Sequence, residues 1–356
     1  MKIIHCSDIH LDSKINELPK EKRNVRKEEI ISTFEKTCAF AVSNDVKAVI
    51  IAGDMFDKEK ITSKTLSRVL NAITKASNVD FLYLPGNHEQ NGFLSKKEIF
   101  PKNLKCFEDS WTAFDYGDVS INGIILNENN SSVVYDNLKL DQSKINIVTM
   151  HGQVAGYKTK DDAEIISLPL LKEKGIDYLA LGHYHSYSSG DIDHRGKYVY
   201  SGCLDGRGFD EVGEKGFVLI ETINGKLNHQ FIEFSSRELF EVKVSVEGLK
   251  DYIQVRERVL SLLGEKVSPN SLVKVVLIGE RVPELDLDIN GLTYSLNNAF
   301  FYAKVKDETL ILVNVNDYDT DKSVRGEFVR LVMESNLTKE EMGEILKTGL
   351  NALKGE

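Results

Sequence analysis

The sequence has few cysteines and no long hydrophobic run. Its four cysteines stand far apart, at positions 6, 38, 106 and 203, and form no C-x-x-C pair. This spacing predicts reduced, mostly buried thiols rather than a disulfide framework or a cysteine-rich zinc site. No apolar segment is long enough to cross a bilayer, and the first predicted strand begins at Lys2, which leaves no room for a signal peptide. We therefore expect a soluble cytoplasmic protein that has no membrane partner.

The chain also lacks an excess of positive charge. It contains 45 Lys and Arg against 55 Asp and Glu, which gives a formal net charge of -10. Proteins that bind nucleic acid usually contact its phosphates through Lys and Arg, so this balance argues against a uniformly basic surface. It does not exclude a nucleic-acid enzyme, because a local basic surface can coexist with an acidic remainder.

Five polar motifs are present, each directly after a short apolar run. The runs are 2–6, 48–52, 79–84, 145–149 and 178–181. The motifs are Asp8-Ile9-His10, Gly53-Asp54-Met55-Phe56-Asp57, Gly86-Asn87-His88-Glu89, Met150-His151-Gly152 and Gly182-His183-Tyr184-His185. Apolar runs rich in β-branched residues that end at Gly or a polar residue are typical of buried strands followed by loops. Amphipathic stretches near 25–43, 62–77 and 163–174 predict helices between several of these strands, and therefore parallel βαβ units.

The motif side chains form a mixed set of possible metal ligands. In parallel sheets, ligands gather at the carboxyl ends of the strands, where these motifs fall. Hard oxygens come from Asp8, Asp54 and Asn87, and imidazole nitrogens come from His10, His151, His183 and His185. This mixture suits Mn, Fe or Zn better than Ca or Mg. Seven ligands are too many for one open catalytic metal, but they fit two metal ions. Two ions roughly 3.5 to 4 Å apart can stabilise both the attacking and the leaving oxygen at phosphorus.

At these residues the chain resembles the calcineurin-like metallophosphoesterase superfamily, whose pattern is D-x-H, G-D-x-x-D, G-N-H-E/D, H and G-H-x-H. The resemblance implies a four-layer α-β-β-α sandwich. It also implies two sets of metal ligands, with Asp54 bridging the two ions. The first set is Asp8, His10, Asp54 and His185, and the second is Asp54, Asn87, His151 and His183.

The same resemblance assigns two residues to catalysis. His88 is implied to be no ligand but the group that stabilises the transition state or protonates the leaving oxygen, which suits an imidazole that titrates near neutral pH. Asp57 resembles the carboxylate that orients this histidine. A helix-start acid, or one that supports a metal ligand, explains Asp57 equally well.

The sequence segments around the motifs resemble one branch of the superfamily, the SbcD-type DNA repair exonucleases. They are 6–13, 52–57, and 181–185 followed by 200–202. The stretches 206–216 and 323–330 look like a smaller YhaO-like bacterial subgroup. Protein phosphatases of the superfamily carry Arg where this chain has Lys58. Archaeal and eukaryotic relatives place His where Asp57 stands, so their strand polarity is not carried over.

The resemblance implies a DNA exo/endonuclease that uses two divalent metal ions, Mn first and Fe or Zn as alternatives, to hydrolyse phosphodiesters in DNA repair. The implied partners are DNA, an SbcC-type coiled-coil ATPase and a second copy of the chain in a homodimer. Two alternatives stay open. One is a phosphodiesterase or phosphatase acting on small nucleotides or phosphoproteins, and the other is a non-catalytic scaffold for an ATPase.

Basic residues near the motifs are candidates for DNA contacts. Arg207, after a Gly-rich turn, and Lys158, in the loop after His151, are the two we select. The segment 14–27 holds six further Lys and Arg, but it also contains acidic residues, so a solvated helix start explains it as well as a DNA track does.

The length of 356 residues predicts two or three domains. We expect a metallophosphoesterase domain at 1–236, with Asn122-Gly123 as a hairpin turn. A strand-helix-strand pattern from 240 onward predicts a small α/β cap domain at 237–320. The segment 321–356 predicts two amphipathic helices, the first with Val324, Phe328, Leu331 and Val332 on one face and the second opened by a Thr338–Glu341 capping box. These helices either pack on the protein's own core or dock a partner.

Overall fold

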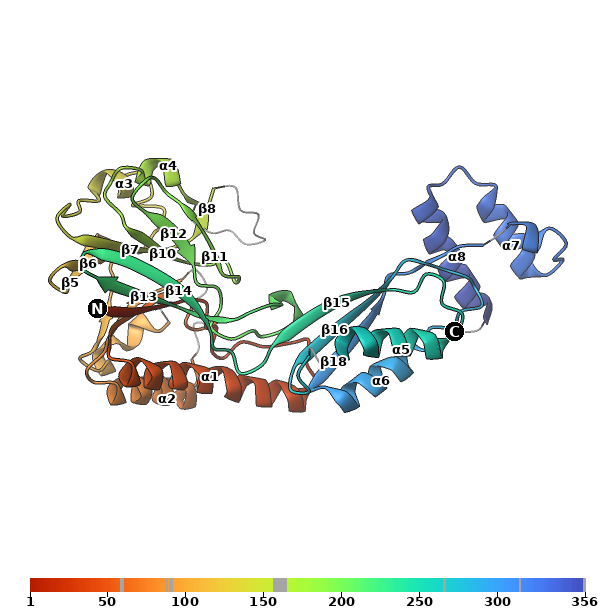
Figure 1. Cartoon of the computed structure of the whole chain (residues 1–356), viewed down its shortest axis with the longest axis horizontal. Coiled ribbons are helices and arrows are strands. Elements are labelled where there is room, and N and C mark those ends of the chain that lie inside the picture. The colour runs from red at the N-terminus through yellow and green to blue at the C-terminus, as the bar shows by residue number, and fades with distance from the viewer. Residues whose placement is uncertain are drawn as a thin grey trace. The chain divides into compact units, whose positions relative to one another are not determined.

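The computed structural model describes residues 1–57, 61–86, 89, 92–155, 165–264, 267–313 and 315–354. These residues divide into two compact units, Met1–Glu238 and Leu239–Glu356 (Figure 1). No helix among the described residues is both long and apolar enough to cross a membrane.

The first unit contains two six-stranded sheets. The first sheet has the order β14-β13-β1-β2-β3-β4. Its strands are β1 (Lys2–Cys6), β2 (Val46–Ala52), β3 (Asp80–Leu84), β4 (Leu104–Cys106), β13 (Gly216–Ile223) and β14 (Lys226–Glu233). Strands β1 to β4 run parallel, and β13 and β14 add antiparallel pairs at one edge. Every residue of β2 except Lys47 is buried, as expected for a parallel strand covered on both faces.

The second sheet has the order β11-β12-β10-β7-β6-β5. Its strands are β5 (Thr112–Asp115), β6 (Val119–Gly123), β7 (Ile145–His151), β10 (Tyr178–Gly182), β11 (Ser188–Asp191) and β12 (Lys197–Tyr200), and β8 (Gln153–Val154) pairs separately with β9 (Ile165–Ile166). Strands β6, β7, β10 and β12 run parallel. The strands before the first three motifs therefore lie in one sheet, and those before the last two lie in the other.

The two sheets face each other across the main core. Ile3, Ile50 and Leu82 of the first sheet share one hydrophobic cluster with Ile147 and Ala180 of the second. Helices cover the outer faces, α1 (Lys20–Ser43) and α2 (Ser63–Lys75) on the first sheet and α3 (Val134–Asn137) and α4 (Leu168–Leu171) on the second (Figure 1). The predicted four-layer α-β-β-α sandwich is confirmed.

Two local predictions in this unit are wrong. Asn122-Gly123 is no hairpin turn, because both residues pair with β5 inside β6, and the chain instead turns at Gly117, whose φ is +77°. A glycine is needed at 123 for packing, since a Cβ there would lie 2.5 Å from the Phe107 ring. The helix predicted at 163–174 is reduced to the single turn α4, with β9 before it.

The second unit opens with a parallel sheet in the order β15-β16-β18. Its elements are β15 (Leu239–Ser245), α5 (Tyr252–Leu263), β16 (Leu272–Ile278), α6 (Ile289–Ala299) and β18 (Tyr302–Asp307), and a pair of short strands, β17 (Glu280–Arg281) and β19 (Leu310–Ile311), follows. Asp251 and Asp288 cap the two helices by accepting backbone N–H bonds. The strand-helix-strand pattern expected from the sequence is present.

The unit ends with α7 (Val324–Met333) and α8 (Lys339–Lys354). The predicted capping box is confirmed, because the Glu341 carboxylate accepts the Thr338 N–H at 2.8 Å and Thr338 Oγ1 accepts the Glu341 N–H at 3.3 Å. The apolar face expected on α7 is partly wrong. Val329 and Val332 are buried in a cluster with Ile311 and Leu346, whereas Val324 and Leu331 are 73% and 61% exposed.

Candidate metal centre

The loops after β1 and β2 are joined backbone to backbone at the site. The Asp8 N–H donates to Gly53 O and the His10 N–H to Asp54 O, each at 3.0 Å. Asp8, His10 and Asp54 have φ values of 50°, 47° and 49°, in the left-handed region that non-glycine residues seldom adopt. Such backbone strain is typical of functional sites, where the surrounding structure fixes the side-chain directions.

Glycines let the two sheets approach each other at this point. A Cβ at Gly53 would lie 1.9 Å from His151 Nδ1, and one at Gly182 would lie 1.8 Å from Ala52 O. A larger residue at either position would therefore push the β7 and β10 loops away from the β2 loop. The glycines that precede Asp54 and His183 in their motifs serve this close approach.

Two groups of possible ligand atoms meet around Asp8. Asp8, His10 and His185 form one group, and Asp8, Asp54 and His151 form the other, with the ligand atoms of each within 4.8 Å of one another. His10 Nε2 lies 3.1 Å from His185 Nε2 and 3.9 Å from Asp8 Oδ1. Asp54 Oδ2 lies 4.0 Å from His10 Nε2 and 3.4 Å from His151 Nε2, so this carboxylate lies between the two groups.

His183 is the third imidazole from the second sheet. Its backbone N–H donates to both Asp8 oxygens, at 3.1 and 3.0 Å, and its φ is 103°. Its Nε2 atom is buried and has no hydrogen-bond partner among the described residues. A buried ring nitrogen without a partner is costly in a folded protein, and a metal ion is one group that would satisfy it.

The pKa values of His10 and His151 shift in opposite directions. Burial lowers the pKa of His10. Burial would also lower the pKa of His151, but the Asp54 carboxylate outweighs it and raises this pKa to about 9. The raised pKa of His151 thus reflects the negative charge that Asp54 places beside its ring. The oxygen and nitrogen donors of the two groups, together with the partnerless Nε2 of His183, fit two divalent metal ions.

A chain of charged groups supports His185 from behind. Its Nδ1 lies 2.8 Å from Glu211 Oε1, and Glu211, at the end of the 3-10 turn Phe209–Glu211, is 4% exposed. Burial would raise the pKa of Glu211, but the bonds from His185 and Arg207 bring it well below its ordinary value. A carboxylate can only accept, so the proton sits on Nδ1 and Nε2 is left facing the metal site.

Arg207 completes this chain. Its guanidinium contacts Glu211 Oε1 at 2.5 Å and Asp57 Oδ1 at 3.2 Å. The guanidinium therefore lies between two carboxylates, and the DNA contact expected for Arg207 stays a prediction. Asp57 Oδ1 also lies 3.4 Å from His10 Nδ1, which fits the reading of Asp57 as an acid that supports a metal ligand.

Glu89 anchors the third motif. One of its oxygens accepts the Phe56 N–H at 2.8 Å, and the other accepts the Tyr83 hydroxyl at 2.6 Å and the Gly86 N–H at 3.1 Å. Burial raises the pKa of Glu89 to about 8. Three other predicted site residues, Asn87, His88 and Lys158, lie outside the described residues.

Sequence reasoning assigned no role to Glu211 or Glu89. Glu89 stands in the third motif, directly after the predicted site residues Asn87 and His88. Glu211 lies 26 residues after His185, and nothing in that spacing marks it as a partner of the imidazole. The one sequence signal near Glu211 is the segment 206–216, which resembles a bacterial subgroup.

Replacing Glu211 with glutamine is expected to weaken metal binding about 10- to 100-fold, the usual cost of losing an outer partner of a ligating histidine. The amide removes the charge that fixes the His185 proton and can turn either an oxygen or an N–H toward the ring. Calorimetric titration of the metal-free protein with Mn²⁺ measures this affinity. Glu214→Gln, an exposed acid in the same segment, is the control. Equal affinities in the two variants would contradict a role for Glu211.

The fold and the ligand groups define a phosphoesterase with a two-metal site. The model of the calcineurin-like phosphoesterase family matches residues 1–187, more than half of the chain. The protein therefore belongs to the calcineurin-like phosphoesterase family.

Several curated relatives are similar over most of the chain. The chain is 26% identical over 300 residues to the "Uncharacterized metallophosphoesterase YhaO" of Bacillus subtilis, covering 78% of this chain and 72% of that protein. It is 26% identical over 291 residues to the "DNA double-strand break repair protein Mre11" of Methanopyrus kandleri, covering 72% and 62%. The Mre11 protein of Methanosarcina mazei is 24% identical over 351 residues, with coverage of 93% and 54%. The chain thus spans less than two thirds of these two Mre11 proteins.

Proposed function

We propose that this protein is a Mn-dependent DNA exo/endonuclease that hydrolyses phosphodiester bonds in DNA repair. The observation that carries the proposal is the pair of ligand groups that share Asp8, with Asp54 lying between them. The names of the Mre11 relatives support DNA as the substrate. The mixed oxygen and imidazole donors suit Mn, Fe or Zn, and the family resemblance puts Mn first.

The residues of the chain divide the chemistry between them. Two bound divalent ions would activate the attacking water and neutralise charge on the phosphate. Asp8 supplies a carboxylate to both groups, Asp54 supplies one between them, and Glu211 holds His185 with its Nε2 toward the site. The attacking water gives one proton to solvent, and its oxygen forms the new bond to phosphorus while the bond from phosphorus to the ester oxygen breaks. His88 gives a proton to the departing oxygen.

The acidic net charge is compatible with this substrate. Much of the local negative charge belongs to the carboxylates that would hold the metal ions, and bound cations cancel part of it. The four cysteines are all buried and unpaired, which supports the expected cytoplasmic location.

Cleavage of end-labelled DNA by the metal-stripped protein tests the proposal. We expect Mn²⁺ to restore shortening of duplex or single-stranded DNA, and Asp54→Ala to abolish it under all conditions. Mg²⁺ and Zn²⁺ are added in parallel to establish metal preference. Hydrolysis of a generic phosphodiester without any DNA cleavage, even when an SbcC-type ATPase is added, would overturn the proposal in favour of a small-nucleotide substrate.

The implied partners are part of the same proposal. An SbcC-type coiled-coil ATPase would contact α7, where Val324 and Leu331 are exposed and stand two helical turns apart. A homodimer is also proposed. Light scattering of the protein with and without the ATPase tests both, because a mass of one chain under each condition would exclude both assemblies.

A further inference from the structure

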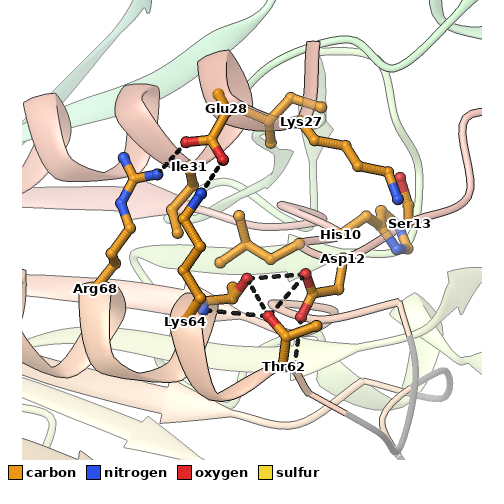
Figure 2. Close-up of a pocket in the computed structure, with 12 residues that line it drawn as sticks. His10, Asp12, Ser13, Lys27, Glu28, Ile31, Thr62, Lys64 and Arg68 are labelled. Carbon is orange, nitrogen blue, oxygen red and sulfur yellow. Dashed lines mark hydrogen bonds and ion pairs between the residues drawn. The ribbon is translucent and has the colours of Figure 1, made fainter. Parts of the chain in front are cut away.

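A small cavity lies beside the candidate metal centre, between α1, α2 and the loop that follows β1 (Figure 2). Its volume is about 130 Å³, several times the roughly 30 Å³ that one water occupies in the liquid. His10, Asp12 and Ser13 come from the loop, Lys27 and Glu28 from α1, and Thr62, Lys64 and Arg68 from the start of α2. Lys64 and Glu28 have largely exposed side chains, which places the rim at the protein surface.

Most charged groups around this cavity are already paired. The Asp12 carboxylate accepts the Thr62 N–H and the Thr65 hydroxyl, each at 2.8 Å, so it caps the N-terminus of α2 (Figure 2). Glu28 pairs with both Lys64 and Arg68, and Arg68 also pairs with Glu35. Two cations therefore offset two carboxylates, and the helix dipole offsets the charge of Asp12.

Two donors remain without a partner among the described residues. Ser13 is 4% exposed, and its Oγ is buried without a hydrogen bond. Lys27 has no ion pair within the described part of the chain, and in Figure 2 its side chain extends along the cavity toward Ser13. A buried hydroxyl left unpaired next to an uncommitted ammonium indicates a ligand that carries an acceptor oxygen and a single negative charge.

The cavity shares a wall with the reaction centre. His10 lines it, while the Nε2 of the same ring lies within 3.9 Å of Asp8 and 3.1 Å of His185. His10 therefore borders both the cavity and the candidate metal centre. A polynucleotide with its reacting phosphate at the metals would bring a neighbouring phosphate to this position.

We propose that Lys27 and Ser13 form a subsite for a neighbouring phosphodiester of a polynucleotide strand. One ammonium matches the single charge of a phosphodiester better than the two charges of a terminal phosphate. The subsite deepens the proposed nuclease function and rests on it. The proposal assigns phosphate binding to Lys27 of the basic segment 14–27. Arg26 of the same segment is fully buried and pairs with Asp205 instead.

Binding of a cleavage-resistant phosphorothioate oligonucleotide by the Mn-loaded protein tests the subsite. Lys27→Gln is expected to weaken binding about fivefold to tenfold at moderate salt, because it removes one charge-assisted contact. It should also reduce the slope of log binding constant against log salt by about 1. Lys36→Gln, an exposed lysine of the same helix outside the cavity, should match the wild type on both measures.

Ser13→Ala separates the hydrogen bond from the charge. It should weaken binding about twofold to fivefold while leaving the salt slope unchanged, because no charge is lost. The ratio of kcat/KM for the oligonucleotide to that for bis(p-nitrophenyl) phosphate should fall in both cavity variants. Thermal unfolding confirms that each variant folds.

The outcomes distinguish the subsite from the enzyme. A wild type that cleaves DNA, together with Lys27→Gln and Lys36→Gln variants that bind identically, would overturn the subsite and leave the nuclease function standing. A wild type that neither binds nor cleaves DNA would overturn both. A Lys27→Gln variant with weaker binding and a smaller salt slope supports the subsite.

Discussion

Asp8→Ala is expected to remove metal binding and hydrolysis together. Asp8 belongs to both ligand groups, and its two oxygens also accept the His183 N–H, so its loss disrupts both metal positions at once. We expect kcat for a generic phosphodiester to fall on the order of 10³-fold or more, since the groups that stabilise the transition-state charge are lost. Kinetics and metal content per chain are the two measurements.

His88→Ala provides the contrast for this prediction. It should be as inactive toward an ester with a poor leaving group, yet retain both metals. The family resemblance implies that His88 stabilises the transition state or protonates the leaving oxygen and is not a ligand. Asp136→Ala, an exposed acid on α3, should retain both activity and metals. An active Asp8→Ala protein with two bound metals would contradict the ligand assignment, and a fully active His88→Ala protein would contradict the catalytic role.

Arg26→Ala is expected to destabilise the first unit by about 3 to 5 kcal/mol, the usual cost of breaking a buried ion pair from one side. Arg26 is fully buried on α1 and pairs with Asp205, which is also buried. Its guanidinium also donates to Gly206 O at 3.0 Å and to Ser236 Oγ at 2.6 Å. Urea unfolding followed by circular dichroism measures the change in the free energy of unfolding.

A surface pair is the control for Arg26. Lys97 and Glu108 lie 3.3 Å apart with side chains 59% and 63% exposed, so Lys97→Ala should cost less than about 1 kcal/mol. The double change Arg26→Met with Asp205→Leu should recover part of the loss, because it leaves no unpaired buried charge. A loss below 1 kcal/mol in Arg26→Ala would show that this ion pair does not stabilise the unit.

The Arg26 network also connects α1 to the metal site. Asp205 accepts from Thr33 and Ser236 at 2.7 Å each, and it stands two residues before Arg207. The turn that delivers Arg207 and Glu211 is therefore fixed to α1 by buried bonds. Arg26→Ala should consequently weaken metal binding in addition to stability, by loosening the support of His185.

Much of the fold could be predicted because its strands have a local pattern. The runs before Asp8, Asp54 and His183 are short and apolar, and each forms a buried strand as expected. Their parallel pairing follows from the helices between them. Local rules failed where tertiary packing used a residue differently, as at Gly123, which gives room to the Phe107 ring inside a strand rather than forming a turn.

The sequence by itself determined most of the elements, the order of the motifs and the type of ligand atom at the centre, because strand periodicity and ligand chemistry are properties of neighbouring residues. Only the tertiary structure decided that Glu211 supports His185, that Arg207 lies between Glu211 and Asp57, and that Ser13 and Lys27 line one cavity. These contacts mostly join residues far apart in the chain or on different elements. No periodicity records such a contact, since it depends on how helices and sheets pack.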